Sequence, residues 1–283
     1  MLDLSVIVPA RNAEHLIDDC LASIARSRPR ETIVVDGMST DRTLAIARGY
    51  GARVISDQGR GLPAARMLGA RAAQSRLVAL VDADVVLPEG ALAGLVEEFE
   101  SGGYDGLQAG LVSVSGPGYW GRALVNHHRS GLSRDWFGLV ATIFDREKLL
   151  EHALDEEFRS GEDIELRWRL KRAGARIGVS RQTVVTHRFD DTFAFARGQW
   201  LADGQGFGRM LRKHGLRSVW LIGVPFAAAV RGVVLSLGRR QPRWILYYAC
   251  FLFFNYVGLL GALANALGAR IPGRKSVGVS AQP

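Results

Sequence analysis

The stretch Leu77–Pro88, LVALVDADVVLP, begins with a continuous apolar run that ends in two carboxylates, Asp82 and Asp84. A short apolar run that stops abruptly at polar residues is typical of a strand buried on both faces. The two aspartates then follow the carboxyl end of that strand. Carboxylates one residue apart repel each other unless a cation lies between them or water surrounds them.

Three similar runs precede this one and predict a sheet. They are Leu4–Pro9 (LSVIVP), Thr32–Asp36 (TIVVD) and Arg53–Ser56 (RVIS), with helix-like segments at 13–26, 41–49 and 63–75 between the four runs. Apolar strands that alternate with helices indicate an α/β domain with a mostly parallel, Rossmann-like sheet covered on both faces. Such sheets bind ligands at the carboxyl ends of their strands.

Polar clusters follow the first two runs at the ends where a ligand is expected. PARN occupies 9–12 and DGMSTD occupies 36–41. Asp36 stands at a strand end beside Gly37, where its carboxylate could accept hydrogen bonds from a ribose or a base. Asp41 fits better as the N-cap of the following helix.

Asp82 and Asp84 together suggest a metal site. Mg²⁺ and Mn²⁺ take oxygen ligands and are usually held by one or two carboxylates plus the phosphates of a substrate. The pair at the end of the fourth strand therefore predicts a site for a divalent cation and a diphosphate.

A second acidic pair, Glu162-Asp163, follows Gly161 and opens a predicted helix that runs to about Arg172. Acids in a first helical turn complement the helix dipole whatever else they do. Two adjacent acids that face a cleft could also supply a general base beside a bound substrate.

These motifs together resemble the family 2 glycosyltransferases with the GT-A fold. The resemblance covers about residues 4–190. Its pieces, in order, are SVIVPARN at 5–12, VVDGMSTDRT at 34–43, GLPAARMLGA at 61–70, LVDADV at 80–85 and GEDIELRWRLKRAG at 161–174.

The resemblance implies transfer of a sugar from a nucleotide-diphospho-sugar to an acceptor hydroxyl or phosphate, with inversion at the anomeric carbon. By position, Pro9, Arg11 and Asp36 would line the nucleotide pocket. Asp82 and Asp84 would form the metal and diphosphate motif, with Asp84 the more direct metal ligand. The expected cofactor is Mg²⁺ or Mn²⁺.

The same resemblance assigns roles to the remaining candidates. Asp163 matches the catalytic base and Glu162 is its neighbour in the acidic pair. His187 falls where some GT-A enzymes have a further metal ligand, although a hydrogen-bonded structural role is an equal alternative. Arg60 could approach the diphosphate or remain in solvent. His127-His128 fits best as a solvent-facing pair.

The sequence departs from the family pattern at two positions of the nucleotide region. Asp36-Gly37-Met38-Ser39 lacks a second acid, and Met67 replaces a frequent Asn. These changes leave the nucleotide and the sugar open. The Gln-x-x-Arg-Trp element of processive synthases is absent, because 197–200 reads RGQW. We therefore do not expect processive polymerisation.

Charge divides the chain into two parts. Residues 1–203 contain all 28 acidic residues and 25 of the 36 cations, whereas 204–283 contain eleven cations and no acid. This basic excess lies beside apolar segments, so it favours anionic lipid headgroups as partners over nucleic acid. Cys20 and Cys250 are too few and too far apart for a disulfide scaffold.

The predicted organisation has four parts. A catalytic domain at 1–205 precedes an amphipathic interfacial helix at 206–217, a hydrophobic membrane region at 218–270 and a basic flexible tail at 271–283. Residues 244–269 carry no charge and are long enough to cross a bilayer, whereas Arg231 interrupts 218–238, so one or two spans remain possible. The chain begins MLDLSVIVPA without a signal-like segment, which predicts a catalytic domain on the cytoplasmic face of the inner membrane.

The expected function is therefore a membrane-associated glycosyltransferase that acts on a lipid-linked or cell-envelope glycan acceptor. A polyprenyl-phosphate sugar synthase, with a phosphate acceptor, is a close alternative. A nucleotidyltransferase is less consistent, because the loop after the first strand is poor in glycine. A noncatalytic membrane adaptor would have little need for both acidic pairs.

Overall fold

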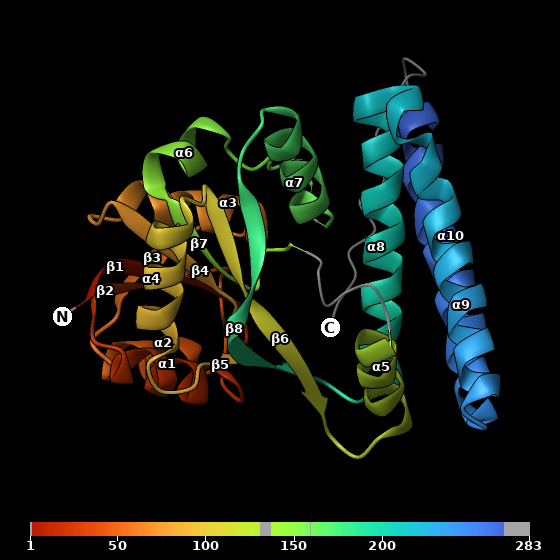
Figure 1. The fold of residues 1–283 in the computed structure, drawn as a ribbon, viewed down its shortest axis with the longest axis horizontal. Coiled ribbons are helices and arrows are strands. Elements are labelled where there is room, and N and C mark those ends of the chain that lie inside the picture. Colours follow the sequence, from red (N-terminus) through yellow and green to blue (C-terminus); the bar gives the residue numbers. More distant parts are fainter. Residues whose placement is uncertain (1, 131–136, 159, 269–283) are drawn as a thin grey trace.

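The computed structural model describes residues 2–130, 137–158 and 160–268. Within these ranges the chain forms a sheet domain and, beside it, a layer of long helices from its C-terminal part (Figure 1). The predicted tail at 271–283 lies outside the described residues.

One sheet of eight strands has the order β3-β2-β1-β4-β7-β6-β8-β5. β1 is parallel to β2 and β4, β2 is parallel to β3, and β6 is parallel to β8. β7 runs antiparallel between β4 and β6, and β5 is antiparallel to β8. The strands are β1 (Leu2–Ala10), β2 (Pro29–Asp36), β3 (Arg53–Ser56), β4 (Leu77–Val81), β5 (Val85–Val86), β6 (Gly106–Ser115), β7 (Ala141–Asp145) and β8 (Ile177–Phe189).

The four apolar runs of the sequence are the four parallel strands β1 to β4, so the mostly parallel α/β sheet is confirmed. Successive side chains of a strand point to opposite faces. On β1, Val6 packs into the core that contains Leu21, whereas Ile7 packs on the other face with Met67. Both faces are therefore buried. The helices of this domain are α1 (Ile17–Arg26), α2 (Thr43–Gly49), α3 (Leu62–Ala72), α4 (Ala91–Gly102), α6 (Arg146–Glu151) and α7 (Glu162–Arg172).

The helical layer stands along one side of the sheet domain (Figure 1). It consists of α5 (Tyr119–Ser130), α8 (Phe193–His214), η2 (Gly215–Gly223), α9 (Val224–Gly238), η3 (Pro242–Trp244) and α10 (Ile245–Gly268). Two helical stretches, Phe193–Gly238 and Pro242–Asn265, are long and apolar enough to cross a membrane. α8 continues without a break through residue 205, where the sequence analysis placed a domain boundary.

α8 and α10 pack closely because glycines stand where they touch. A Cβ on Gly204 would lie 1.9 Å from the carbonyl oxygen of Asn255, and a Cβ on Gly258 would lie 2.2 Å from that of Leu201. No side chain fits at such a distance, so these glycines allow the two backbones to meet. The helices therefore form one unit.

Candidate active site

The carboxyl ends of β1 and β2 lie side by side, so the polar clusters of the sequence come together. Ala10 and Asp36 are direct partners in the register, and the Gly37 N–H donates to the Ala10 carbonyl at 2.8 Å. The buried Asp36 carboxylate accepts hydrogen bonds from the backbone N–H groups of Met38 (3.2 Å) and Ser39 (3.1 Å). Asp36 therefore stabilises the turn at Gly37–Ser39, independently of any ligand that it also binds.

A cavity of about 240 Å³ opens at this edge of the sheet. Pro9 and Arg11, both predicted nucleotide contacts, line it. Asp57 lines it as well, and its buried carboxylate accepts hydrogen bonds from the N–H groups of Gly59 (2.8 Å) and Gly61 (3.0 Å). The sequence reasoning missed Asp57, although an aspartate followed by Gln-Gly-Arg-Gly is a signal for a side chain that folds its own loop.

Arg60, in the same loop, forms an ion pair with Glu156. This pair ties the β3–α3 loop to the segment before α7. The Arg60 guanidinium remains more than half exposed. A contact between Arg60 and a diphosphate stays a prediction, and it requires Arg60 to leave Glu156.

Arg66 of α3 joins two parts of the site that are distant in sequence. Its Nη2 donates to Asp82 Oδ1 and its Nη1 donates to Glu162 Oε1, both at 2.6 Å, and only 3% of its side chain is exposed. The guanidinium fork suits two carboxylates at once. Arg66 thereby holds the end of β4 against the first turn of α7. The sequence reasoning missed it, and a lone arginine among the apolar residues of LPAARMLGA was the available signal.

Asp84 and His187 form the part of the site that fits a metal ion. His187 lies on β8, opposite Val85 of β5, and its Nε2 is 3.2 Å from Asp84 Oδ2. Asp84 Oδ1 and His187 Nδ1 are buried without a hydrogen-bond partner in the described part of the chain. Burying such atoms unpaired is costly, so a bound ligand would account for the carboxylate oxygen.

The protein could supply only part of a metal's coordination at this point. The described residues contain no group of three or more His, Cys, Asp or Glu side chains able to hold an ion. Mg²⁺ and Mn²⁺ commonly complete their shell with water and substrate phosphates. A cation held by Asp84 and His187 would therefore need the diphosphate of a donor.

Burial dominates the electrostatics of the acidic groups. It raises the pKa of Asp82 and the pKa of Glu162, while the charge of Arg66 acts against it in both cases. For His187, burial acts to lower the pKa, but the hydrogen bond to Asp84 and the nearby aspartate charges outweigh it and raise the pKa. A concentration of carboxylates in a buried site favours a bound cation.

Glu162 and Asp163 open α7 as predicted, but their surroundings differ. Glu162 is buried and held by Arg66, whereas Asp163 is half-buried. Asp163 Oδ2 lies 3.4 Å from the position a Cβ would take on Gly138. A general base needs a carboxylate that a substrate can reach. Of the two acids, Asp163 is the better candidate.

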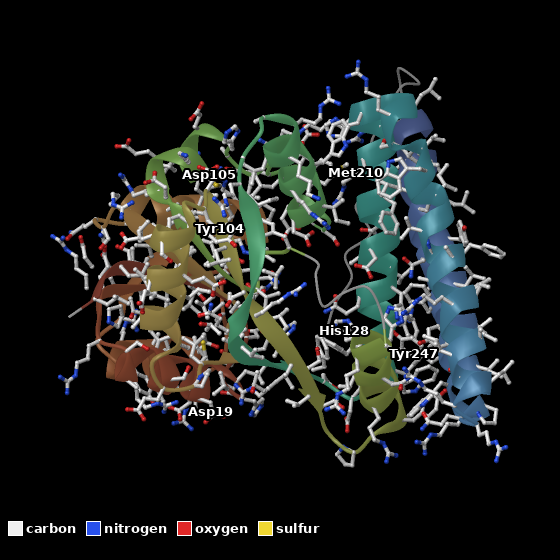
Figure 2. All side chains as sticks on the ribbon, in the orientation of Figure 1. Asp19, Tyr104, Asp105, His128, Met210 and Tyr247 are labelled. Carbon is white, nitrogen blue, oxygen red and sulfur yellow. The ribbon has the colours of Figure 1, made fainter. Side chains whose placement is uncertain are left out.

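His127 and His128 do not face solvent as expected, because α5 packs between the sheet domain and α10 (Figure 2). His128 Nδ1 lies 3.2 Å from Ser113 Oγ, and the His127 ring packs against Tyr247 and Phe251. Burial lowers the pKa of His127 to about 4 and that of His128 to about 3. Both rings are therefore neutral near pH 7 and serve packing.

Solved structures similar to this chain include GT-A glycosyltransferases. The mannosyltransferase PcManGT from Pyrobaculum calidifontis, solved with GDP-mannose and Mn²⁺, has a TM-score of 0.64 and 22% identity, covering 91% of this chain and 87% of that one. Glucosyl-3-phosphoglycerate synthase from Mycobacterium tuberculosis, solved with Mn²⁺, UDP and phosphoglyceric acid, has a TM-score of 0.55 and 23% identity, covering 75% of this chain and 78% of that one. The GT-A fold inferred from the sequence is confirmed.

The family follows from the sequence match. The family model described as Glycosyl transferase family 2 matches residues 5–159, more than half of the chain. The chain belongs to this family. The 4,4'-diaponeurosporenoate glycosyltransferase of Staphylococcus aureus is 36% identical over 119 residues, which are 39% of this chain and 31% of that relative. The match therefore spans about a third of the relative's own length.

Proposed function

We propose that this chain is a metal-dependent, inverting glycosyltransferase at the cytoplasmic face of the inner membrane. It would transfer a sugar from a nucleotide-diphospho-sugar to a hydroxyl group of a lipid-linked or cell-envelope glycan acceptor. One observation carries this proposal: a single guanidinium, that of Arg66, holds the Asp82 end of β4 against the helical turn that carries Asp163. These contacts support one shared site for a diphosphate and a base.

The donor would lie along the carboxyl edge of the sheet. Its nucleoside would occupy the cavity lined by Pro9 and Arg11, with Asp36 at the adjoining strand end. Its diphosphate would point toward Asp84 and His187. A bound Mg²⁺ or Mn²⁺ there would neutralise the charge that develops on the nucleoside diphosphate as it leaves.

Asp163 would act on the acceptor. As the acceptor oxygen attacks the anomeric carbon, its proton passes to the Asp163 carboxylate. The bond between the anomeric carbon and the diphosphate oxygen breaks with its electron pair on the leaving group. Attack from the face opposite the leaving group inverts the configuration. Glu162, tied to Arg66, would position this turn of α7 and take no proton.

The first experiment tests donor binding. Detergent-purified protein is titrated with UDP-, GDP- and dTDP-sugars, with Mn²⁺ and then with a chelator. We expect metal-dependent binding of one donor, and loss of that binding in Asp84→Ala. Asp3→Ala is the matched control, because Asp3 lies at the start of β1 and is 70% exposed. Failure of every donor to bind in the presence of metal would refute the proposal.

The second experiment concerns the acceptor and separates the alternatives. Asp163→Asn should abolish transfer to a hydroxyl while donor binding persists, because a hydroxyl must lose its proton to attack. A phosphate acceptor is already ionised, so a polyprenyl-phosphate sugar synthase would keep much of its activity in this variant. Donor binding without transfer of the sugar, in wild-type protein supplied with membrane lipids, would point to a noncatalytic role.

A further inference from the structure

The helical layer presents many apolar side chains to the outside. Trp220, Phe226, Val234, Leu237, Phe253 and Leu260 are each between 55% and 63% exposed. On α9, Phe226, Val234 and Leu237 follow a helical spacing that sets them on one stripe. Most of the large apolar side chains that are exposed in the described residues belong to η2, α9 and α10, and such a concentration marks a binding surface.

The opposite face of the helical layer packs against the rest of the protein. Trp200 of α8 and Tyr247 of α10 are fully buried in a core shared with α5. Arg231, the charge that interrupts α9, donates a hydrogen bond to the Ser130 carbonyl at the C-terminal end of α5. Its guanidinium therefore points toward α5, while part of the residue stays exposed. One face of the layer is therefore buried within the protein, and the other exposes apolar side chains.

The packing of α8 decides how this layer could meet a bilayer. Gly204 of α8 contacts Asn255, which lies near the middle of α10. If α10 crossed the bilayer, Asp203 would lie at the depth of the bilayer centre. An ionisable side chain at that depth is disfavoured when it meets hydrocarbon.

The catalytic turn would follow α8 into the bilayer. Gly206 of α8 lies against Gly161, with 3.0 Å between the position of a Gly161 Cβ and Gly206 Cα, and Glu162 comes next in the chain. Figure 1 shows the sheet domain beside the helices along their length, with α7 toward one end and α5 toward the other. A spanning orientation of α10 would therefore carry a polar domain into the hydrocarbon.

We propose that α9 and α10 lie in the plane of the membrane, with the apolar face of Trp220, Phe226, Val234, Leu237, Phe253 and Leu260 inserted into one leaflet of an anionic phospholipid bilayer. The lipid charge is indicated by exposed cations at the α9–α10 turn, Arg239, Arg240 and Arg243, and by the absence of any acid after residue 203. Cations this close to an anionic surface are attracted to it. The inference rests on the membrane association in the proposed function.

Label depth tests the orientation without using glycosyl transfer. Nitroxide labels are placed at Phe226→Cys, Leu237→Cys, Phe253→Cys and Leu260→Cys in a Cys250→Ala background, since the buried Cys20 is inaccessible to the reagent. The full chain is bound to vesicles of phosphatidylglycerol and phosphatidylethanolamine. Depth is read from the ratio of oxygen to nickel-complex accessibility. Glu97→Cys, on the exposed side of α4, is the aqueous control.

The proposal predicts similar depths for all four labels, about 5–10 Å below the headgroups. Phe226 and Leu237 are 11 residues apart, so a spanning α9 would separate their depths by about 16 Å. Such a gradient would overturn the proposal. A second result would also overturn it: spectral broadening from label–label contact in lipid-free protein, together with no binding to vesicles. That result would mean that a second copy of the chain covers the apolar face. Equal shallow depths without sugar transfer would refute only the enzymatic proposal.

A substitution pair checks the contribution of the face itself. Val234→Glu places a charge on the stripe, where Val234 is 61% exposed, so folding should be unaffected. We expect vesicle affinity to fall about 10-fold or more, since the apolar contact is lost and a charge enters the interface. Val184→Glu, at a 40% exposed valine of β8, should leave affinity unchanged. Equal affinities of the two variants would contradict the assigned surface.

Discussion

Replacing Arg66 with methionine should destabilise the fold more than any other single change at the site. The guanidinium is 3% exposed and makes two contacts of 2.6 Å, to Glu162 (8% exposed) and Asp82 (23% exposed). Removing one partner of a buried ion pair costs about 3–5 kcal/mol, because the remaining charge stays buried. Asp82 can regain some water, so we expect about 3 kcal/mol, or a fall in Tm on the order of 6–12 °C.

Urea or thermal unfolding of the detergent-purified protein measures this difference. Arg71→Met is the matched control, because Arg71 belongs to the same helix and is exposed, and it should change stability by less than about 0.5 kcal/mol. Adding Glu162→Gln to Arg66→Met should restore part of the stability and none of the activity. If Arg66→Met were as stable as Arg71→Met, the argument that Arg66 couples β4 to α7 would be wrong.

Three further changes test other parts of the structure. His127, whose pKa burial lowers to about 4 in the folded protein, binds fewer protons there than when unfolded, so stability should fall as pH drops from about 6.5 toward 4. His127→Phe should flatten that fall by about 1–2 kcal/mol, measured as unfolding free energy against pH. Gly204→Ala should separate α8 from α10 and lower stability by at least about 2 kcal/mol, whereas Gly261→Ala, with open space around it on α10, should be neutral or stabilising; equal effects would contradict the close contact. Met38 has a φ of +68°, a backbone conformation that strains a residue with a side chain. Met38→Gly should relieve this strain and raise Tm or leave it unchanged. A clear fall in Tm would show that the Met38 side chain stabilises the fold by more than the strain costs.

The sequence was sufficient for the parallel half of the sheet. Strands buried on both faces need unbroken apolar runs, and such runs are visible without any tertiary information. β5 has only two residues, and it is a strand because Val85 pairs with His187, a hundred positions later. Pairings of that kind depend on the whole fold, so strands β5 to β8 could not be predicted locally.

The acidic residues of the candidate site could be named from the sequence, but their contacts with other residues could not. Asp82, Asp84 and Asp163 could be named because acids at strand ends and helix starts are conspicuous. The partner of an acid is not visible in the sequence. Arg66 and Glu162 are 96 residues apart and come into contact only because α3 and α7 pack in the folded chain. Likewise His127 has no local mark of burial, since α10 covers it from far along the chain.

The contact between Gly161 and Gly206 has a practical consequence for handling the enzyme. A truncated protein could be made that stops before α8 and so lacks the apolar helices. It would lose the α8 backbone that packs against the turn of Asp163, and it would expose the α5 surface that Trp200 covers. A water-soluble form is better sought by changing exposed side chains: polar residues in place of Phe226, Val234 and Leu260, each more than half exposed, would keep the packing between α8 and α10. Such surface substitutions would remove the need for detergent while all of the helices are retained.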